Sequence, residues 1–112
     1  MDEPTSTVFV RNIKEILRIS FSEIREYPLL NEDDKSFTAF ELSDRFWVRL
    51  QCVPCLEGWI LEFNDRRQPL DWLNFEVPLM DGGLLDVDGM KDVAEGMRDI
   101  VVERMVADLL CA

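Results

Sequence analysis

The chain has 112 residues, with 23 acidic against 12 basic side chains, a formal net charge of -11 and no histidine. A surface this negative repels nucleic acid and anionic lipid and attracts basic surfaces, and the lack of histidine removes the side chain most used for proton transfer near neutral pH. Because 47% of the residues are hydrophobic, we expect a single folded domain over residues 1–112 and not an acidic disordered chain.

The N-terminus and the cysteines indicate a cytoplasmic protein. The chain begins Met1-Asp2-Glu3-Pro4, which is acidic where a secretory signal peptide would be basic. Its apolar runs are all shorter than the roughly 20 residues needed to span a bilayer. Its three cysteines, an odd number, do not suit a secreted disulfide framework.

The first element is expected to be a helix. Residues 1–7 are interpreted as a polar leader. From Val8 to Tyr27 the apolar residues recur at three- and four-residue spacings, which predicts a helix. Pro28 disfavours helical geometry at the residue before it and is expected to end the segment. Residues 31–35 are then expected to form a solvated turn.

Beyond this turn the apolar period changes to two, which is typical of half-buried strands. Four strands are predicted, at residues 37–42, 46–53, 59–63 and 72–77. Their short connections imply an antiparallel meander. One face of this sheet is apolar, and the other is expected to carry Trp47, Arg49, Gln51, Ile60, Glu62, Trp72, Asn74 and Glu76.

A second helix is predicted at the C-terminus. Asp86 or Asp88 can cap it, and Asp88 is favoured because Gly89 and the apolar periodicity follow at once. Its inner stripe is expected to be Met90, Val93, Ala94, Met97, Ile100, Val101, Met105 and Leu109. A helix that is apolar on a second side is either deeply buried or half of an interface. That second side, the candidate oligomer seam, consists of Val102, Val106 and Leu110.

The predicted fold class is therefore α+β. An N-terminal helix, a four-stranded antiparallel meander and a C-terminal helix follow one another, with both helices on one face of the sheet. This layering follows because each amphipathic element must bury its apolar face.

The sheet face opposite the helices is the candidate partner-binding site. Trp47 and Trp72 are large rings among polar neighbours, and tryptophan is enriched at binding hot spots. The alternative is that these rings lie over the edge of the core or are covered by a loop. The residues predicted to contact a basic partner are Trp47, Trp72, Glu41, Glu62, Glu76, Arg49 and Ile60.

Two motifs resemble known redox or metal sites, but each lacks a feature that such a site needs. Cys52 and Cys55 form a CxxC, which suits a redox pair or half of a zinc site. However, Cys52 ends a predicted strand, whereas a thioredoxin-like redox cysteine lies at a helix N-terminus. With Cys111 the chain offers three of the four ligands that zinc usually takes. Leu84 to Glu95 resembles a calcium loop, but its first ligand position is Leu84.

These observations predict no catalysis, no cofactor and no bound metal. No serine or cysteine has a histidine partner for nucleophilic catalysis, and there is no Gly-rich phosphate loop. The paired carboxylates lie in predicted turns, where they are expected to be solvated. Arg66 and Arg67 are expected to balance nearby acids and not to contact phosphate.

The sequence therefore predicts a non-enzymatic protein-binding domain. Our first hypothesis is an inhibitor that occludes a basic, nucleic-acid-binding surface of another protein and does not itself bind nucleic acid. In size and charge the chain resembles phage inhibitors of nucleic-acid-guided defences (anti-CRISPR proteins) and immunity proteins against nuclease toxins. The alternative is a homodimeric cytosolic secretion chaperone or adaptor of the type III class, which is similar in length and acidity.

Overall fold

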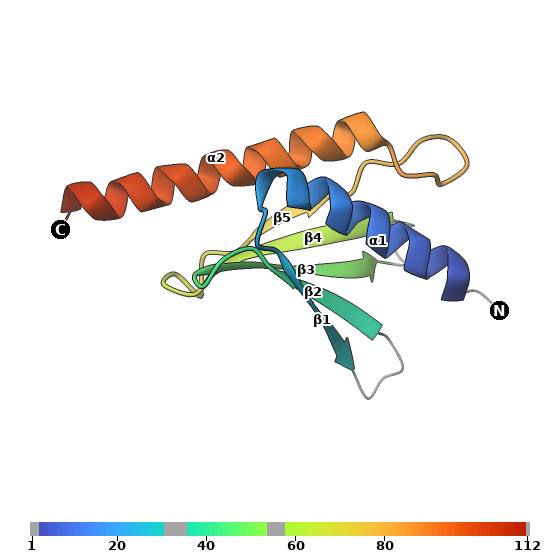
Figure 1. The fold of residues 1–112 in the computed structure, drawn as a ribbon, viewed down its shortest axis with the longest axis horizontal. Helices are drawn as coiled ribbons and strands as arrows, with labels where there is room; N and C mark the ends of the chain where they lie inside the picture. The colour runs from blue at the N-terminus through green and yellow to red at the C-terminus, as the bar shows by residue number, and fades with distance from the viewer. Residues whose placement is uncertain (1–2, 31–35, 54–57, 112) are drawn as a thin grey trace.

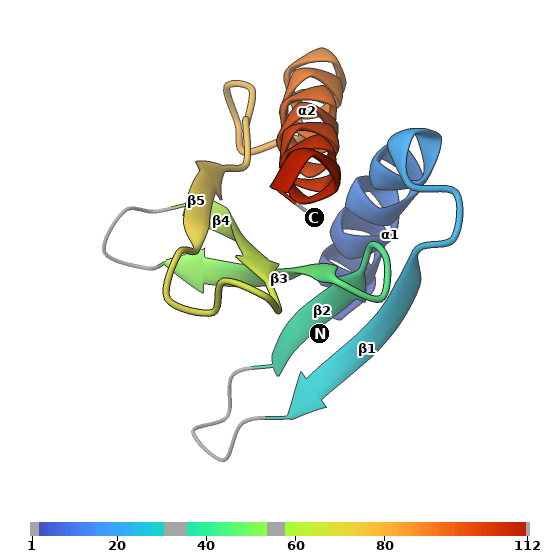
Figure 2. The same cartoon turned by 90° about the vertical axis from the view of Figure 1, so that its left-hand side faces the viewer.

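The α+β class predicted above is confirmed by the computed structural model, which describes residues 3–30, 36–53 and 58–111. The elements are α1 (Glu3–Ser20), β1 (Arg25–Leu30), β2 (Ser36–Glu41), β3 (Phe46–Val53), β4 (Gly58–Asp65), β5 (Leu73–Glu76) and α2 (Val87–Cys111). The strands form one antiparallel meander in the order β1-β2-β3-β4-β5. Both helices lie side by side on one face of this sheet (Figures 1 and 2).

The N-terminal third of the chain differs from the prediction. Strand β1 occupies residues where the end of a helix was expected, so the sheet has five strands and not four. Helix α1 begins at Glu3, within the expected leader, and ends at Ser20. Tyr27 lies opposite Ala39 in the β1–β2 ladder. Pro28 is tolerated within this strand because β1 is at the edge of the sheet.

The other strands match the predicted period. Strand β3 has the predicted bounds, and Val48 lies between Phe40 of β2 and Phe63 of β4 in the register. All three side chains are buried. The core joins both helices to this face of the sheet, and its largest fully buried apolar members are Phe40, Phe46, Phe63, Ile13, Leu17, Leu50, Leu61, Met90 and Met97.

The cap of α2 is Asp86 and not Asp88. The Gly89 backbone amide donates a hydrogen bond to Oδ1 of Asp86 at 3.1 Å, which is the usual geometry of a helix N-cap. Asp88 lies two residues further on and is exposed. A Cβ on Gly89 would lie 2.9 Å from the Cβ of Pro78, so the close approach of the helix to the preceding loop requires glycine here.

Helix α2 is longer than the sheet that it covers. It has 25 residues and is therefore about 37 Å long, and its last turns project past the strands (Figure 1). Met105 and Leu109, expected on the buried stripe, are consequently exposed. The sequence pattern could not reveal this, because it shows which side of a helix is apolar but not where its support ends.

A buried carboxylate holds α2 to the sheet. The alternation that buries Leu61 and Phe63 also points Asp65 inward, where it is 1% exposed. Arg45 of the β2–β3 turn donates to both Asp65 oxygens, at 2.8 and 3.0 Å. Arg104 of α2 donates to Oδ2 of Asp65 at 3.1 Å. The Arg45 guanidinium, aided by the Arg67 amide and by Arg104, lowers the pKa of Asp65 to about 2 against the opposing effect of burial.

The same cluster extends to the surface. Asp108 of α2 accepts hydrogen bonds from Arg45 and from Arg67, the latter at 2.7 Å. Arg104 also pairs with Asp71 at 3.2 Å. The two guanidinium groups of Arg45 and Arg104 lie near aromatic rings, since Arg45 Cζ is 4.9 Å from the centre of the Phe46 ring. The cluster thus fixes the C-terminal half of α2 to two turns of the sheet.

We expect Asp65→Asn to lower the free energy of unfolding by about 3–5 kcal/mol, because it removes the buried carboxylate that the largely buried guanidinium groups of Arg45 and Arg104 share. Asp71→Asn is the matched control. It removes an exposed partner of the same Arg104 and should cost about 0–1 kcal/mol. Chemical denaturation at pH 7 measures both values, and equal losses would contradict the anchoring role.

The low pKa of Asp65 also predicts an acid transition. Its folded-state pKa is about 2 against an ordinary value of 3.8, so its contribution is complete above about pH 4 and is lost as the pH falls toward 2. Unfolding followed between pH 5 and pH 2 should show this loss in the wild type. In the Asp65→Asn variant this part of the pH dependence should be absent.

Candidate partner-binding site on the outer face of the sheet

The outer face of the sheet, on the side away from the helices, carries most of the residues predicted to bind a partner. The register places Glu41, Trp47 and Asn64 in one row across β2, β3 and β4. The next row contains Tyr27, Ala39, Arg49, Glu62 and Asn74. Because alternate residues of a strand point to the same face, these two rows form one continuous surface.

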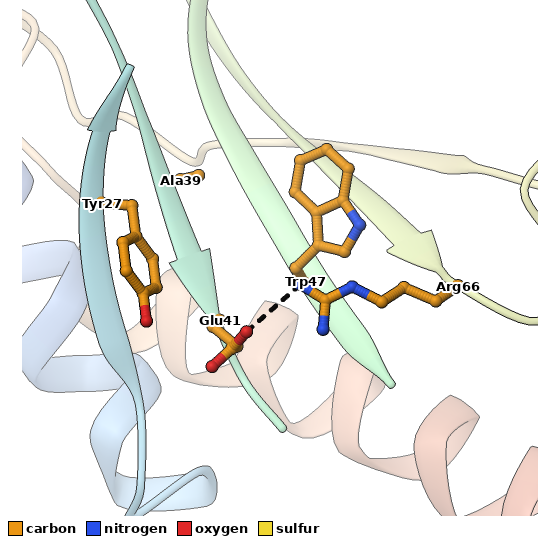
Figure 3. A pocket seen from close by; sticks show the side chains of 5 residues that line it. All are labelled: Tyr27, Ala39, Glu41, Trp47 and Arg66. Atoms are coloured by element: carbon orange, nitrogen blue, oxygen red, sulfur yellow. Dashed lines mark hydrogen bonds and ion pairs between the residues drawn. The ribbon is translucent and has the colours of Figure 1, made fainter. Parts of the chain in front are cut away.

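A cavity of about 330 Å³ opens on this face, lined by Tyr27, Ala39, Glu41, Trp47 and Arg66 (Figure 3). Its origin is the small side chain of Ala39. The methyl group of Ala39 lies on β2, between the large rings that Tyr27 on β1 and Trp47 on β3 contribute. The space that a larger residue would fill on β2 is therefore left open between two aromatic walls.

An ion pair closes one end of this aromatic pocket. Arg66 Nη2 donates to Oε2 of Glu41 at 3.1 Å, and the Arg66 side chain extends toward Glu41 in Figure 3. Arg66 also donates to the backbone carbonyl of Asp44. About half of the Arg66 side chain is exposed, so the pair is accessible to solvent. The expectation that Arg66 and Arg67 balance nearby acids is confirmed, since Arg67 pairs with Asp108.

The other predicted site residues extend the face beyond the pocket. Arg49 Nη2 donates to Oε1 of Glu62 at 3.1 Å, and the Asn64 amide donates to Oε2 of the same residue at 3.2 Å. Ile60 lies between Gln51 and Glu76 in the register. The Glu62 carboxylate is thus held by neighbours on its own chain.

Trp72 does not join the pocket. It precedes the first residue of β5, is 51% exposed, and is not among the lining residues. The structure therefore brings Trp47 and Glu41 together but leaves Trp72 apart. The pocket is also lined by Tyr27, Ala39 and Arg66, which were not predicted as site residues from the sequence. Recognising Pro28 as an edge-strand proline would have placed Tyr27 on this face.

The outer face is balanced in charge. It carries three acids and three arginines, namely Glu41, Glu62, Glu76, Arg25, Arg49 and Arg66. Unbalanced acids follow the solvent side of α2 at three- and four-residue spacings, and these are Asp88, Asp92, Glu95, Asp99 and Glu103. All five are exposed, and none forms an ion pair with any residue that the structure describes.

The other chemical motifs supply no site within the described ranges. Cys52 and Cys111 are exposed free thiols, whereas Cys55 of the CxxC lies outside the residues described. No group of three or more possible metal ligands occurs among the residues searched. Asp86, the first carboxylate in the calcium-like segment, caps α2. Neither helix, over its described length, is both long and apolar enough to cross a bilayer.

Comparison of the chain with protein-family models, curated proteins and solved structures finds no match. The outer face is therefore interpreted from its own geometry.

We expect Ala39→Leu to fill the pocket without harming the fold. The added carbons enter the space between Tyr27 and Trp47, so the free energy of unfolding should change by less than about 1 kcal/mol. Leu61→Ala, in the core on the other face, should cost about 2–5 kcal/mol. Denaturant unfolding of the two variants compares them, and a loss in Ala39→Leu as large as that in Leu61→Ala would mean that the pocket is a part of the core.

Proposed function

We propose that this protein is a non-enzymatic acidic binding domain that inhibits another protein by occluding its basic, nucleic-acid-binding surface. An inhibitor of a phage-targeting defence system or an immunity protein against a nuclease toxin would work in this way. The protein would act by contact alone and would need no cofactor.

The observation that carries this proposal is the aromatic pocket with Glu41 at its end. Two aromatic rings and a carboxylate suit the side chain of an arginine or lysine, because a cation is attracted both to ring faces and to a carboxylate. A guanidinium group already fits at this end, since Arg66 of the same chain pairs with Glu41 there. A basic residue of the partner would take the place of Arg66.

The exchange of one cation for another is energetically accessible. An exposed ion pair contributes little to stability, and the Arg66 side chain is about half exposed. Displacing it costs the chain little, whereas a partner's cation would become buried between Tyr27 and Trp47. The net charge of -11 adds a long-range attraction that speeds association with a basic surface.

The homodimeric chaperone remains a second candidate because of one observation. Val102, Val106 and Leu110, the expected oligomer seam, are all exposed on the projecting end of α2. A chaperone of this kind would use that helix end for assembly and a separate surface for its cargo.

Capture from a bacterial lysate, followed by affinity measurement with the captured protein, tests the inhibitor proposal. Trp47→Ala and Glu41→Gln should each weaken binding at least about tenfold. Asp92→Asn is the control for Glu41→Gln, since it removes one exposed acid from α2, away from the outer face of the sheet, and should change affinity by less than about threefold. The double variant Trp47→Ala/Trp72→Ala should lose binding and keep its fold.

Salt dependence provides an independent measurement. Raising the salt concentration from about 50 to about 500 mM should slow association with a basic partner, because screening shortens the range of the attraction. Binding that is indifferent to salt and to Trp47→Ala would overturn the proposal. Tight association with bare RNA or DNA would overturn it as well.

A further inference from the structure

The projecting end of α2 carries an apolar stripe exposed to solvent. Its members recur at spacings of three and four residues and are Val102, Met105, Val106, Leu109 and Leu110. They are between 45% and 82% exposed. Monomeric proteins rarely leave a contiguous apolar surface of this kind open without a function.

The stripe continues into a cavity on the body of the protein. Met105 and Leu109 form part of the wall of a cavity of about 570 Å³, which also has Phe21, Phe46 and Val101 in its lining. The apolar part of this lining joins the helix to Phe21, just after α1, and to Phe46 of β3. The rest of the lining is polar and consists of Ser43, Asp44, Arg45, Arg67 and Asp108. This is more surface than a lone helix stripe would offer to a partner.

The solvent side of α2 changes character along its length. The five unpaired acids from Asp88 to Glu103 occupy the N-terminal part, and the apolar stripe from Val102 to Leu110 occupies the C-terminal part. The two sets share one side of the helix because residues three, four and seven apart fall on the same face. A partner that seats on the stripe must therefore avoid or neutralise the acids beside it.

We propose that a second copy of this chain occupies the stripe, with the two α2 helices antiparallel and Val106 on the two-fold axis. In this arrangement Val102 of one copy faces Leu110 of the other. The acids from Asp88 to Asp99 then lie outside the overlap of the two helices and point to opposite ends of the dimer. A parallel pairing would instead bring the two acidic rows against each other, which like-charge repulsion disfavours.

The size and charge of the surface predict a dimer of modest affinity. Stable interfaces bury about 800 Å² per partner, and a stripe of five side chains with one adjoining cavity is at the small end of that range. Each copy also carries a net charge of -11. We therefore expect a dissociation constant of about 1–100 μM that falls as salt screens the repulsion.

Sedimentation equilibrium of the full chain tests the dimer. The mean mass should rise from 13.1 kDa toward twice that value between about 1 and about 500 μM, and dimerisation should be stronger at high salt. Binding to a basic partner should become weaker under the same change, so the two proposals can fail separately. A mass of one chain over the whole range would overturn the dimer.

Val106→Asp places two carboxylates face to face on the axis and should weaken dimerisation at least about 100-fold. Ala107→Asp is the matched control, because Ala107 is also exposed but points away from the stripe. It should leave the dissociation constant within about threefold of the wild type. Equal effects of the two substitutions would show that charge alone, and not the stripe, controls association.

Disulfide cross-linking tests the orientation. In a chain whose Cys52, Cys55 and Cys111 are replaced by serine, a mixture of Val102→Cys and Leu110→Cys proteins should form a mixed disulfide dimer under mild oxidation. Val102→Cys alone should remain uncross-linked. Efficient cross-linking of Val102→Cys to itself would indicate a parallel pair and overturn the antiparallel arrangement.

Discussion

The buried Asp65 carboxylate is the contact on which the placement of α2 depends. It lies at the end of β4 and accepts hydrogen bonds from Arg45 in a turn of the sheet and from Arg104 on the helix. A buried charge is tolerated only when it is paired and its oxygens are hydrogen-bonded. Because Arg104 and Asp108 of α2 both join this cluster, the cluster helps to fix the position of α2 along the sheet.

That position determines which surfaces the protein presents. Arg104 pairs with Asp65 at the end of β4, and Asp108 pairs with Arg45 in the β2–β3 turn. With the helix in this position, the apolar residues around Val106 extend past the sheet, while Met90 and Met97 fill the core. The aromatic pocket of Tyr27 and Trp47 forms on the opposite face, where no helix covers the sheet. The pocket and the cavity beside the apolar end of α2 share no lining residue.

The fold was largely predictable where local and tertiary requirements agree. Strict alternation from Phe46 to Val53 identified β3 with its observed bounds. The same reasoning failed at Arg25–Leu30, because Ile24 and Tyr27 continue the spacing of three and four residues found in the preceding helix. The single proline was therefore interpreted as a helix end. The edge position that tolerates Pro28 is a property of the assembled sheet. The candidate site was missed in part for the same reason, since Tyr27 forms one of its walls.

The sequence by itself determined the class of the fold, the two faces of the four strands that it predicted and the acidity of the whole chain, because hydrophobic period and composition are local quantities. Only the tertiary structure decided which charges remain unpaired. Glu41 and Glu62 appear equivalent to Asp92 and Asp99 in the sequence, yet the first two pair with Arg66 and Arg49 across strands. Such pairing depends on register and on loop geometry, which bring together residues 13 to 25 positions apart.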